Sequence, residues 1–124
     1  MGLCVLDDIE YIQKQRASIW QRYTQHLADH FTIQIWNEHS HNNHAYAPIL
    51  FESEAQLLKT EAQLKANNIL ARRYFYPSLD TLEYLQTEQI CKHSRNIAGR
   101  ILCLPLFPTL QQDEQNKIIE MIRI

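Results

Sequence analysis

Hydrophobic residues recur every three or four positions through the first quarter of the chain. This spacing connects Leu6, Ile9, Ile12, Ile19, Tyr23 and Leu27. Polar side chains, among them Glu10 and Gln13, fall on the opposite face. The pattern predicts one long helix over residues 1–30, whose apolar stripe is broken only at Arg16.

Shorter stretches farther along the chain are rich in β-branched and aromatic residues or alternate between apolar and polar positions. Such stretches are typical of strands, and we expect strands over residues 31–36, 44–51, 69–76 and 100–107. Pro48 indicates an edge strand or a bulge, Pro77 ends the third strand, and Pro105 interrupts the fourth.

Helical segments separate the later strands. Ser53 followed by Gln56 has the spacing of a capping box, and Asn67 and Asn68 give a helix end with asparagine in the left-handed position. We therefore expect helices over residues 53–68, 91–98 (capped by Gly99) and 111–124, and a helical turn over 79–85. The predicted fold class is α+β, with a small sheet covered on one side by helices.

The composition narrows the class of protein. A chain of 124 residues with a net charge of −2 is one domain, residues 1–124, without a global field that favours nucleic acid. The sequence has no glycine-rich phosphate loop and no apolar stretch long enough to cross a bilayer. Asp7, Asp8 and Glu10 occupy the place where a signal peptide carries positive charge. We expect a cytoplasmic protein that binds neither nucleic acid nor membrane.

Cysteines and histidines give little sign of redox or metal chemistry. The three cysteines have no disulfide-like spacing, and we expect Cys91 and Cys103 to be small buried hydrophobes. His39, His41 and His44 lie close together in a polar stretch, where a metal site is the alternative to a solvated loop. We favour the solvated loop and expect no metal, because Glu38 alone adds a nearby carboxylate.

The run Arg72-Arg73-Tyr74-Phe75-Tyr76-Pro77 carries more recognition chemistry than a core needs. Arginine forks bind phosphate or carboxylate, and tyrosines stack on rings and donate hydrogen bonds. The alternative is an edge strand whose aromatic rings pack on a helix while the arginines face water. A nucleic-acid site is the weakest interpretation, because two arginines are too small an electrostatic footprint.

Four blocks of sequence resemble one family. These blocks are MGLCVLDDIEYIQKQR, AYAPILF, ARRYFYPSL and RILCLPLFPTL, which span nearly the whole chain in order. Together they resemble the C-terminal small domain, with its leading long helix, of the DegT/DnrJ family of pyridoxal-phosphate-dependent nucleotide-sugar aminotransferases. The resemblance implies the small-domain fold of fold-type I aminotransferases. RRYFYPSL is most similar to the subgroup that aminates dTDP-linked keto-deoxysugars at carbon 4.

The family's cofactor chemistry is missing from this sequence. Members hold pyridoxal phosphate on a lysine in an S-x-H-x-x-K motif, and none of the five lysines here has that context. The resemblance thus implies a chain without its large catalytic domain, inactive alone and without cofactor. The apolar block at residues 3–6 suggests a surface that a missing large domain or a homodimer partner covers, and Met1 coincides with an internal methionine of the family.

The resemblance also implies substrate contacts. We carry over Arg73, Tyr74, Tyr76 and Ser78 as candidate contacts to a nucleotide-linked keto-deoxysugar, used for surface-polysaccharide or antibiotic sugar biosynthesis. Asp80 stands where many relatives have a histidine, and an acidic side chain offers phosphate no positive partner. The alternative function is a stand-alone binding or oligomerisation module without catalysis.

Overall fold

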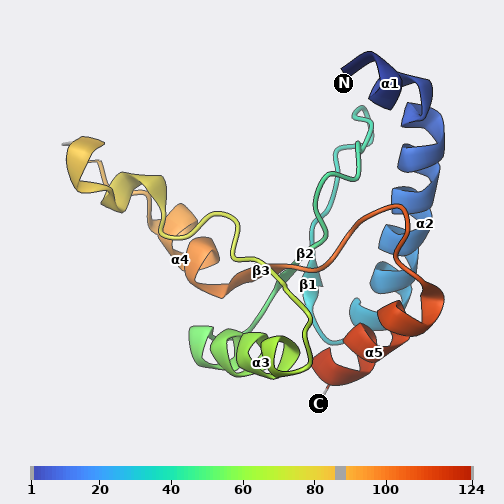
Figure 1. Ribbon diagram of the computed structural model, residues 1–124. Coiled ribbons are helices and arrows are strands. Elements are labelled where there is room, and N and C mark those ends of the chain that lie inside the picture. The colour runs from blue at the N-terminus through green and yellow to red at the C-terminus, as the bar shows by residue number, and fades with distance from the viewer. Residues whose placement is uncertain (1, 86–88, 124) are drawn as a thin grey trace.

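The protein is described by a computed structural model that covers residues 2–85 and 89–123 (Figure 1). In chain order its elements are α1 (Gly2–Asp7), α2 (Ile9–Leu27), β1 (Thr32–Ile33), β2 (Pro48–Leu50), α3 (Glu54–Ala66), the 3-10 turns η1 (Leu79–Thr81) and η2 (Glu83–Leu85), α4 (Lys92–Arg100), β3 (Ile101–Cys103) and α5 (Gln112–Ile122). None of the described helices is both long and apolar enough to cross a membrane.

The three strands form one antiparallel sheet in the order β1-β2-β3. Thr32 lies opposite Leu50 in the first pair, and Ile49 lies opposite Leu102 in the second. The segment that carries Arg72 adds an isolated bridge to Cys103 at the far edge of β3. The predicted α+β fold is therefore confirmed, with the sheet at the centre of the molecule.

The core lies between the sheet and the helices α2, α3 and α5. Its most buried large side chains come from α2, β2, the residue after β2, α3 and β3, and they are Tyr23, Leu27, Ile49, Phe51, Leu57, Leu64 and Leu102. From α5, Ile118, Ile119 and Ile122 complete the cluster. These side chains stand at the apolar positions with helical and strand spacing. Their removal from water drives the packing of the helices onto the sheet.

The strands are shorter than the alternation of residues predicts. In place of residues 31–36, only Thr32–Ile33 pairs, because the register puts Gln34 opposite Pro48. The odd-numbered residues Ala47 and Phe51 hydrogen-bond toward β3, so the nitrogen of Pro48 faces β1 and has no hydrogen to donate. The predicted strands over 44–51, 69–76 and 100–107 reduce to β2, the single bridge at Arg72, and β3.

The helices differ from expectation at three points. The predicted helix over residues 1–30 is divided by a turn at Asp8 and ends at Leu27, and its first residue, Met1, lies outside the described residues. Gly99 does not cap α4, which continues to Arg100, because Gly99 keeps a negative φ and the Ile101 N–H still donates to the Ile97 carbonyl. The last predicted helix is α5, which ends at Ile122, and Ile124 lies outside the described residues.

Three other local predictions are confirmed, at Ser53, Asn68 and Cys103, and one, at Cys91, is wrong. Ser53 is the N-cap of α3, and its Oγ accepts a hydrogen bond from the Gln56 N–H at 3.2 Å. Asn68 has a left-handed φ of 60°, where glycine is the usual residue. Cys103 is buried, but the prediction for Cys91 is wrong, since this residue is exposed just ahead of α4.

Candidate functional site

The segment that carries the Arg-Arg-Tyr-Phe-Tyr-Pro run follows the end of α3 and passes along β3. Backbone hydrogen bonds join Arg72 and Cys103 in both directions, at 3.0 and 2.8 Å. The chain then turns through cis peptide bonds at Tyr74–Phe75 and Tyr76–Pro77 before it enters η1. The bridge fixes the start of the segment on the sheet, and successive side chains leave it on different sides.

Arg73 lies in a compact polar cluster between α3 and α4. One terminal nitrogen, Nη2, donates to Glu54 Oε1 at 2.6 Å and to the Gly99 carbonyl at 3.1 Å. The guanidinium carbon lies 3.7 Å from the centre of the Tyr76 ring, which is a cation–π contact. With 14% of its side chain exposed, Arg73 is largely committed to neighbours within the chain, whereas Tyr76 is 53% exposed.

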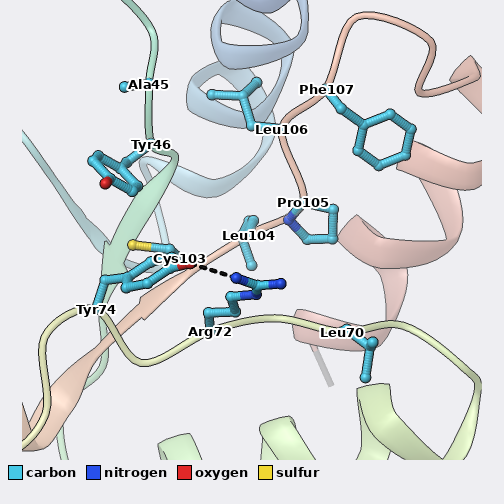
Figure 2. Close-up of a pocket in the computed structure, with 10 residues that line it drawn as sticks. All are labelled: Ala45, Tyr46, Leu70, Arg72, Tyr74, Cys103, Leu104, Pro105, Leu106 and Phe107. Carbon is cyan, nitrogen blue, oxygen red and sulfur yellow. Dashed lines mark hydrogen bonds between the residues drawn. The ribbon is translucent and has the colours of Figure 1, made fainter.

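Tyr74 belongs to a separate aromatic group on the other side of the segment. Its hydroxyl accepts a hydrogen bond from Arg72 Nη1 at 2.6 Å. Its ring meets Tyr46 edge-on, with 5.3 Å between ring centres, and Phe75 packs beside both. Arg72, Tyr46 and Tyr74 line a cavity of about 330 Å³ that β3 and the residues after it complete (Figure 2).

Cys103 forms part of the wall of that cavity. Burial raises the pKa of its thiol to about 11. A thiol with so high a pKa remains protonated at neutral pH, so Cys103 is a packing residue and not a nucleophile.

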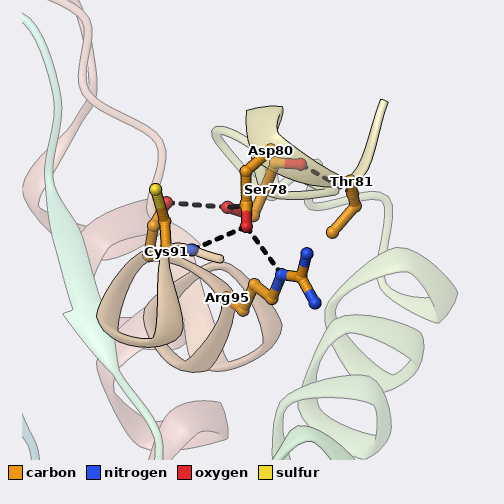
Figure 3. Close-up of polar contacts among 6 residues, drawn as sticks. Ser78, Asp80, Thr81, Cys91 and Arg95 are labelled. Atoms are coloured by element: carbon orange, nitrogen blue, oxygen red, sulfur yellow. Dashed lines mark hydrogen bonds and ion pairs between the residues drawn. The ribbon is translucent and has the colours of Figure 1, made fainter. Parts of the chain in front are cut away.

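Ser78 and Asp80 connect the turn after the motif to the start of α4 (Figure 3). The Asp80 carboxylate accepts hydrogen bonds from Ser78 Oγ at 2.5 Å, from the Cys91 N–H at 2.8 Å and from Arg95 Nε at 2.7 Å. The hydrogen bond from Ser78, followed by those from Cys91 and Arg95, lowers the pKa of Asp80 to about 2. Ser78 Oγ also lies 2.8 Å from Ser94 Oγ.

The four carried-over residues therefore occupy three neighbouring clusters and not one pocket. Tyr74 and Ser78 border a second cavity of about 500 Å³ between the motif and α4, and Tyr74 alone borders the first. Sequence reasoning missed the partners that hold these residues, chiefly Glu54, Tyr46 and Ser94. Tyr46 lies in one of the family-like blocks, but nothing in the sequence indicates that it contacts Tyr74.

The histidine-rich stretch is a surface loop. His39 and His41 are exposed, and burial lowers the pKa of His44. Within residues 2–85 and 89–123, no group of three or more histidine, cysteine or acidic side chains is placed to hold a metal ion.

Pyridoxal phosphate does not fit the residues that this chain supplies. The cofactor needs a lysine withdrawn from water, an acidic partner for the pyridine nitrogen and a cup for its phosphate. All five lysines are exposed. Lys117 borders a cavity beside Glu114, but the Glu114 carboxylate already accepts the Gln111 N–H that begins α5.

Comparison with known proteins gives the class. The sequence profile of the DegT/DnrJ/EryC1/StrS aminotransferase family matches residues 1–123. The chain belongs to this family of aminotransferases.

Individual relatives agree with the family profile. The dTDP-4-amino-4,6-dideoxy-D-glucose transaminase of Shigella dysenteriae is 36% identical over 129 residues, which is 98% of this chain and 35% of that enzyme. A crystal structure of a DegT DnrJ EryC1 StrS aminotransferase from Brucella abortus matches 98% of this chain and 32% of its own, with a TM-score of 0.79 and 26% identity. DesI, crystallised in the presence of its TDP-sugar product, matches 99% of this chain and 33% of its own, with a TM-score of 0.88 and 27% identity.

These relatives are much longer than the chain. The chain spans about a third of the length of each of them. What their names say of substrates is therefore a property of whole proteins three times its size.

Proposed function

We propose that this chain is the C-terminal small-domain part of a pyridoxal-phosphate-dependent sugar aminotransferase. The observation that carries the proposal is the family match over residues 1–123, combined with relatives of which the chain covers only about a third. The proposed substrate is a nucleotide-linked keto-deoxysugar of the dTDP series, destined for surface-polysaccharide or antibiotic sugar biosynthesis. This class is supported by the Shigella transaminase and by DesI with its TDP-sugar product.

In this proposal the chain supplies no cofactor chemistry of its own. Pyridoxal phosphate, when bound by a complete family member, supplies the electron sink for amino transfer. The exposed lysines of this chain do not hold it, so the lysine belongs to the large domain in this proposal. A polypeptide containing that domain, or a homodimer partner that carries it, is the proposed partner. A function on soluble nucleotide-linked sugars favours the cytoplasm as the location.

Arg73, Tyr74, Tyr76 and Ser78 are the proposed substrate-side residues. Tyr76 is the strongest of them, because its ring is half exposed and rests on a guanidinium that Glu54 and the Gly99 carbonyl hold in place. Ser78 is only 5% exposed, so its proposed contribution depends on the turn that it anchors through Asp80 and Ser94. Tyr74 has its hydroxyl already engaged by Arg72 and offers mainly its ring.

The first experiment reads the DNA immediately upstream of the Met1 codon in all three frames. We expect a coding sequence that contains S-x-H-x-x-K, in frame or one frameshift away. The polypeptide encoded there is then produced together with this chain and supplied with pyridoxal phosphate, dTDP-4-keto-6-deoxyglucose and a panel of amino acids as donors. Mass spectrometry detects the amino sugar.

Two matched variants sharpen this assay. Tyr76→Ala removes the exposed ring and should lower kcat/KM by about tenfold, since aromatic contacts carry much of the binding energy at such sites. Tyr84→Ala removes an exposed tyrosine outside the proposed cluster and should leave kcat/KM unchanged. An unrelated gene or a terminator upstream would instead favour the stand-alone binding or oligomerisation module.

A second experiment examines the chain alone. The purified chain is mixed with one equivalent of pyridoxal phosphate, reduced with borohydride and digested for peptide mapping. We expect only sparse labelling spread over several lysines, because all five are exposed and solvated. Stoichiometric labelling of a single lysine, abolished by substituting that lysine, would contradict the proposal that the cofactor lysine lies elsewhere.

A further inference from the structure

Arg72 is held in place more firmly than an ordinary surface arginine. Its backbone is fixed by the pair of hydrogen bonds to Cys103, and its Nη1 donates to the Tyr74 hydroxyl at 2.6 Å. The guanidinium carbon also lies 5.8 Å from the centre of the Tyr74 ring. Backbone and side chain are both oriented before any ligand arrives, which reduces the entropy cost of binding.

The charge of Arg72 has no acidic partner in the described part of the chain. Arg73 and Arg95 form ion pairs with Glu54 and Asp80, whereas the structure shows none for Arg72. Once Nη1 is bound to Tyr74, the Nε–H and Nη2–H edge of the guanidinium remains, and it has no hydrogen-bond partner among the described residues. That edge presents two parallel donors, which match the two oxygens of a carboxylate or a phosphate.

The cavity around Arg72 places aromatic and apolar side chains beside this polar edge, although its lining is mixed in character. The wall includes two tyrosine rings together with Leu70, Cys103, Leu104, Pro105 and Phe107 (Figure 2). A volume of about 330 Å³ accommodates a six-membered ring with a substituent, at the lower end of the range for small-molecule sites. A fixed cation beside aromatic and apolar side chains can orient a ring through a single anionic group, because a few placed polar groups set the orientation of a ligand in such pockets.

We propose that this cavity binds a small molecule that carries an oxyanion on a ring-sized body. The Nε and Nη2 donors of Arg72 hold the oxyanion, and Tyr46, Tyr74 and Phe107 contact the ring. The site goes beyond the proposed aminotransferase function, because Arg72 is not among the proposed substrate-side residues and the lining residues all belong to this chain.

The test uses the chain itself and three probes of equal ring size. Benzoate and phenyl phosphate carry the two kinds of oxyanion, and benzamide is the neutral control. Titration of the ¹⁵N-labelled chain, followed by NMR, should show both oxyanions shifting the Arg72 Nε–H resonance and the amide resonances around the cavity. Tighter binding of benzoate than of phenyl phosphate, or the reverse, identifies which oxyanion the site prefers.

Variants distinguish the effect of the paired Nε and Nη2 donors from the effect of positive charge alone. Arg72→Gln should weaken the binding of both oxyanions by about tenfold or more, because hydrogen bonds from a charged group are lost. Arg72→Lys keeps the charge but loses the paired donors, and it should weaken binding by a smaller factor. Arg123→Gln removes an equal charge from the exposed end of α5 and should change nothing.

Three results would overturn the proposal. The first is equal affinity of Arg72→Gln and the unaltered chain for both oxyanions. The second is equal affinity of benzamide and benzoate, which would make the cavity an apolar site only. The third is a loss in Arg123→Gln as large as that in Arg72→Gln. Circular dichroism spectra confirm that each variant is folded, and the lysine variant keeps the test valid if the glutamine variant is not.

Discussion

The carboxylate of Asp80 gathers three donors from different parts of the chain. Ser78 lies two residues earlier, while Cys91 and Arg95 belong to the start of α4. With its two oxygens so occupied, Asp80 faces α4 and does not present its charge to a ligand. An aspartate at this position therefore fixes the turn after the motif to the helix that follows.

This arrangement predicts an acid-dependent loss of stability. The hydrogen bonds lower the pKa of Asp80 from an ordinary value of 3.8 to about 2 in the folded chain. A lowered pKa means that the unfolded chain binds the proton more readily, so the stabilisation is present above about pH 4 and is lost as the pH falls toward 2. Asp80→Asn should thus unfold at a lower temperature than the unaltered chain at pH 6, and the difference should shrink steadily as the pH falls from about 4 toward 2.

Thermal unfolding between pH 2 and 6 measures this difference. Asp29→Asn is the control, because the Asp29 side chain is exposed and shows no hydrogen bond to the residues that the structure describes. Its unfolding temperature should follow that of the unaltered chain. If the difference in unfolding temperature between Asp80→Asn and the unaltered chain stays constant from pH 2 to pH 6, the stabilisation does not come from ionised Asp80.

At the residue scale, the sequence identifies the unusual residues but not their partners. The run of arginines and tyrosines over residues 72–76 is conspicuous in the sequence alone. Arg73 nevertheless pairs with Glu54, which lies 19 positions earlier, and Asp80 pairs with Arg95, which lies 15 positions later. Such pairings depend on how the segments cross the sheet, so no local signal shows them.

At the element scale, α3 could be predicted almost completely because its signals are local. Ser53 caps its first turn, and Asn68 takes the left-handed conformation just past its end. The strands could not be predicted to their full bounds, because pairing depends on the neighbouring strand. Residues 34–36 alternate as a strand should, yet the register puts Gln34 opposite Pro48, whose missing N–H ends the ladder.

The cap of α3 gives a prediction about helix stability. Ser53→Ala removes the Oγ that accepts the Gln56 N–H, and it should lower the free energy of unfolding by about 1 kcal/mol. Urea denaturation measures the change. Ser18→Ala, at an exposed position within α2, is the matched control and should leave stability unchanged or slightly higher, because alanine favours a helix interior. Equal effects of the two substitutions would contradict the capping role.

The contact between α2 and α5 depends on a buried amide that the hydrophobic pattern does not reveal. Gln115 is 3% exposed, and its Nε2 donates to the Ile19 carbonyl at 2.7 Å. Gln115→Ala should lower the free energy of unfolding by roughly 1 to 3 kcal/mol, because a buried hydrogen bond is lost. Gln112→Ala, on the exposed first turn of the same helix, should have little effect in the same urea titration. An unchanged free energy of unfolding in Gln115→Ala would show that the hydrogen bond to the Ile19 carbonyl makes no net contribution to stability.

At the scale of the whole molecule, the two ends of the long helical arm differ in character. The C-terminal half of α2 is buried against the sheet and α5 through Ile19, Tyr23 and Leu27. At the other end, α1 buries no residue and lies away from α5 (Figure 1). Leu3 and Leu6 are 80% and 60% exposed there, on an apolar surface that the described residues do not cover.

That surface leads to a prediction about assembly. Exposed apolar side chains grouped on one helix favour association, so the purified chain should self-associate and bind a hydrophobic dye. Leu3→Asp together with Leu6→Asp should shift it toward the monomer and reduce dye fluorescence several-fold. The unfolding temperature should not fall, because neither side chain packs on the core.

Sedimentation velocity and dye titration at matched concentrations check these outcomes. Leu58→Asp, at a half-exposed position on α3, is the control and should leave self-association as it is in the unaltered chain. If the double variant instead loses stability, α1 packs within the chain. If neither assembly nor dye binding changes, the apolar surface of α1 is not an interface, and the proposed large domain has to contact this chain through another face.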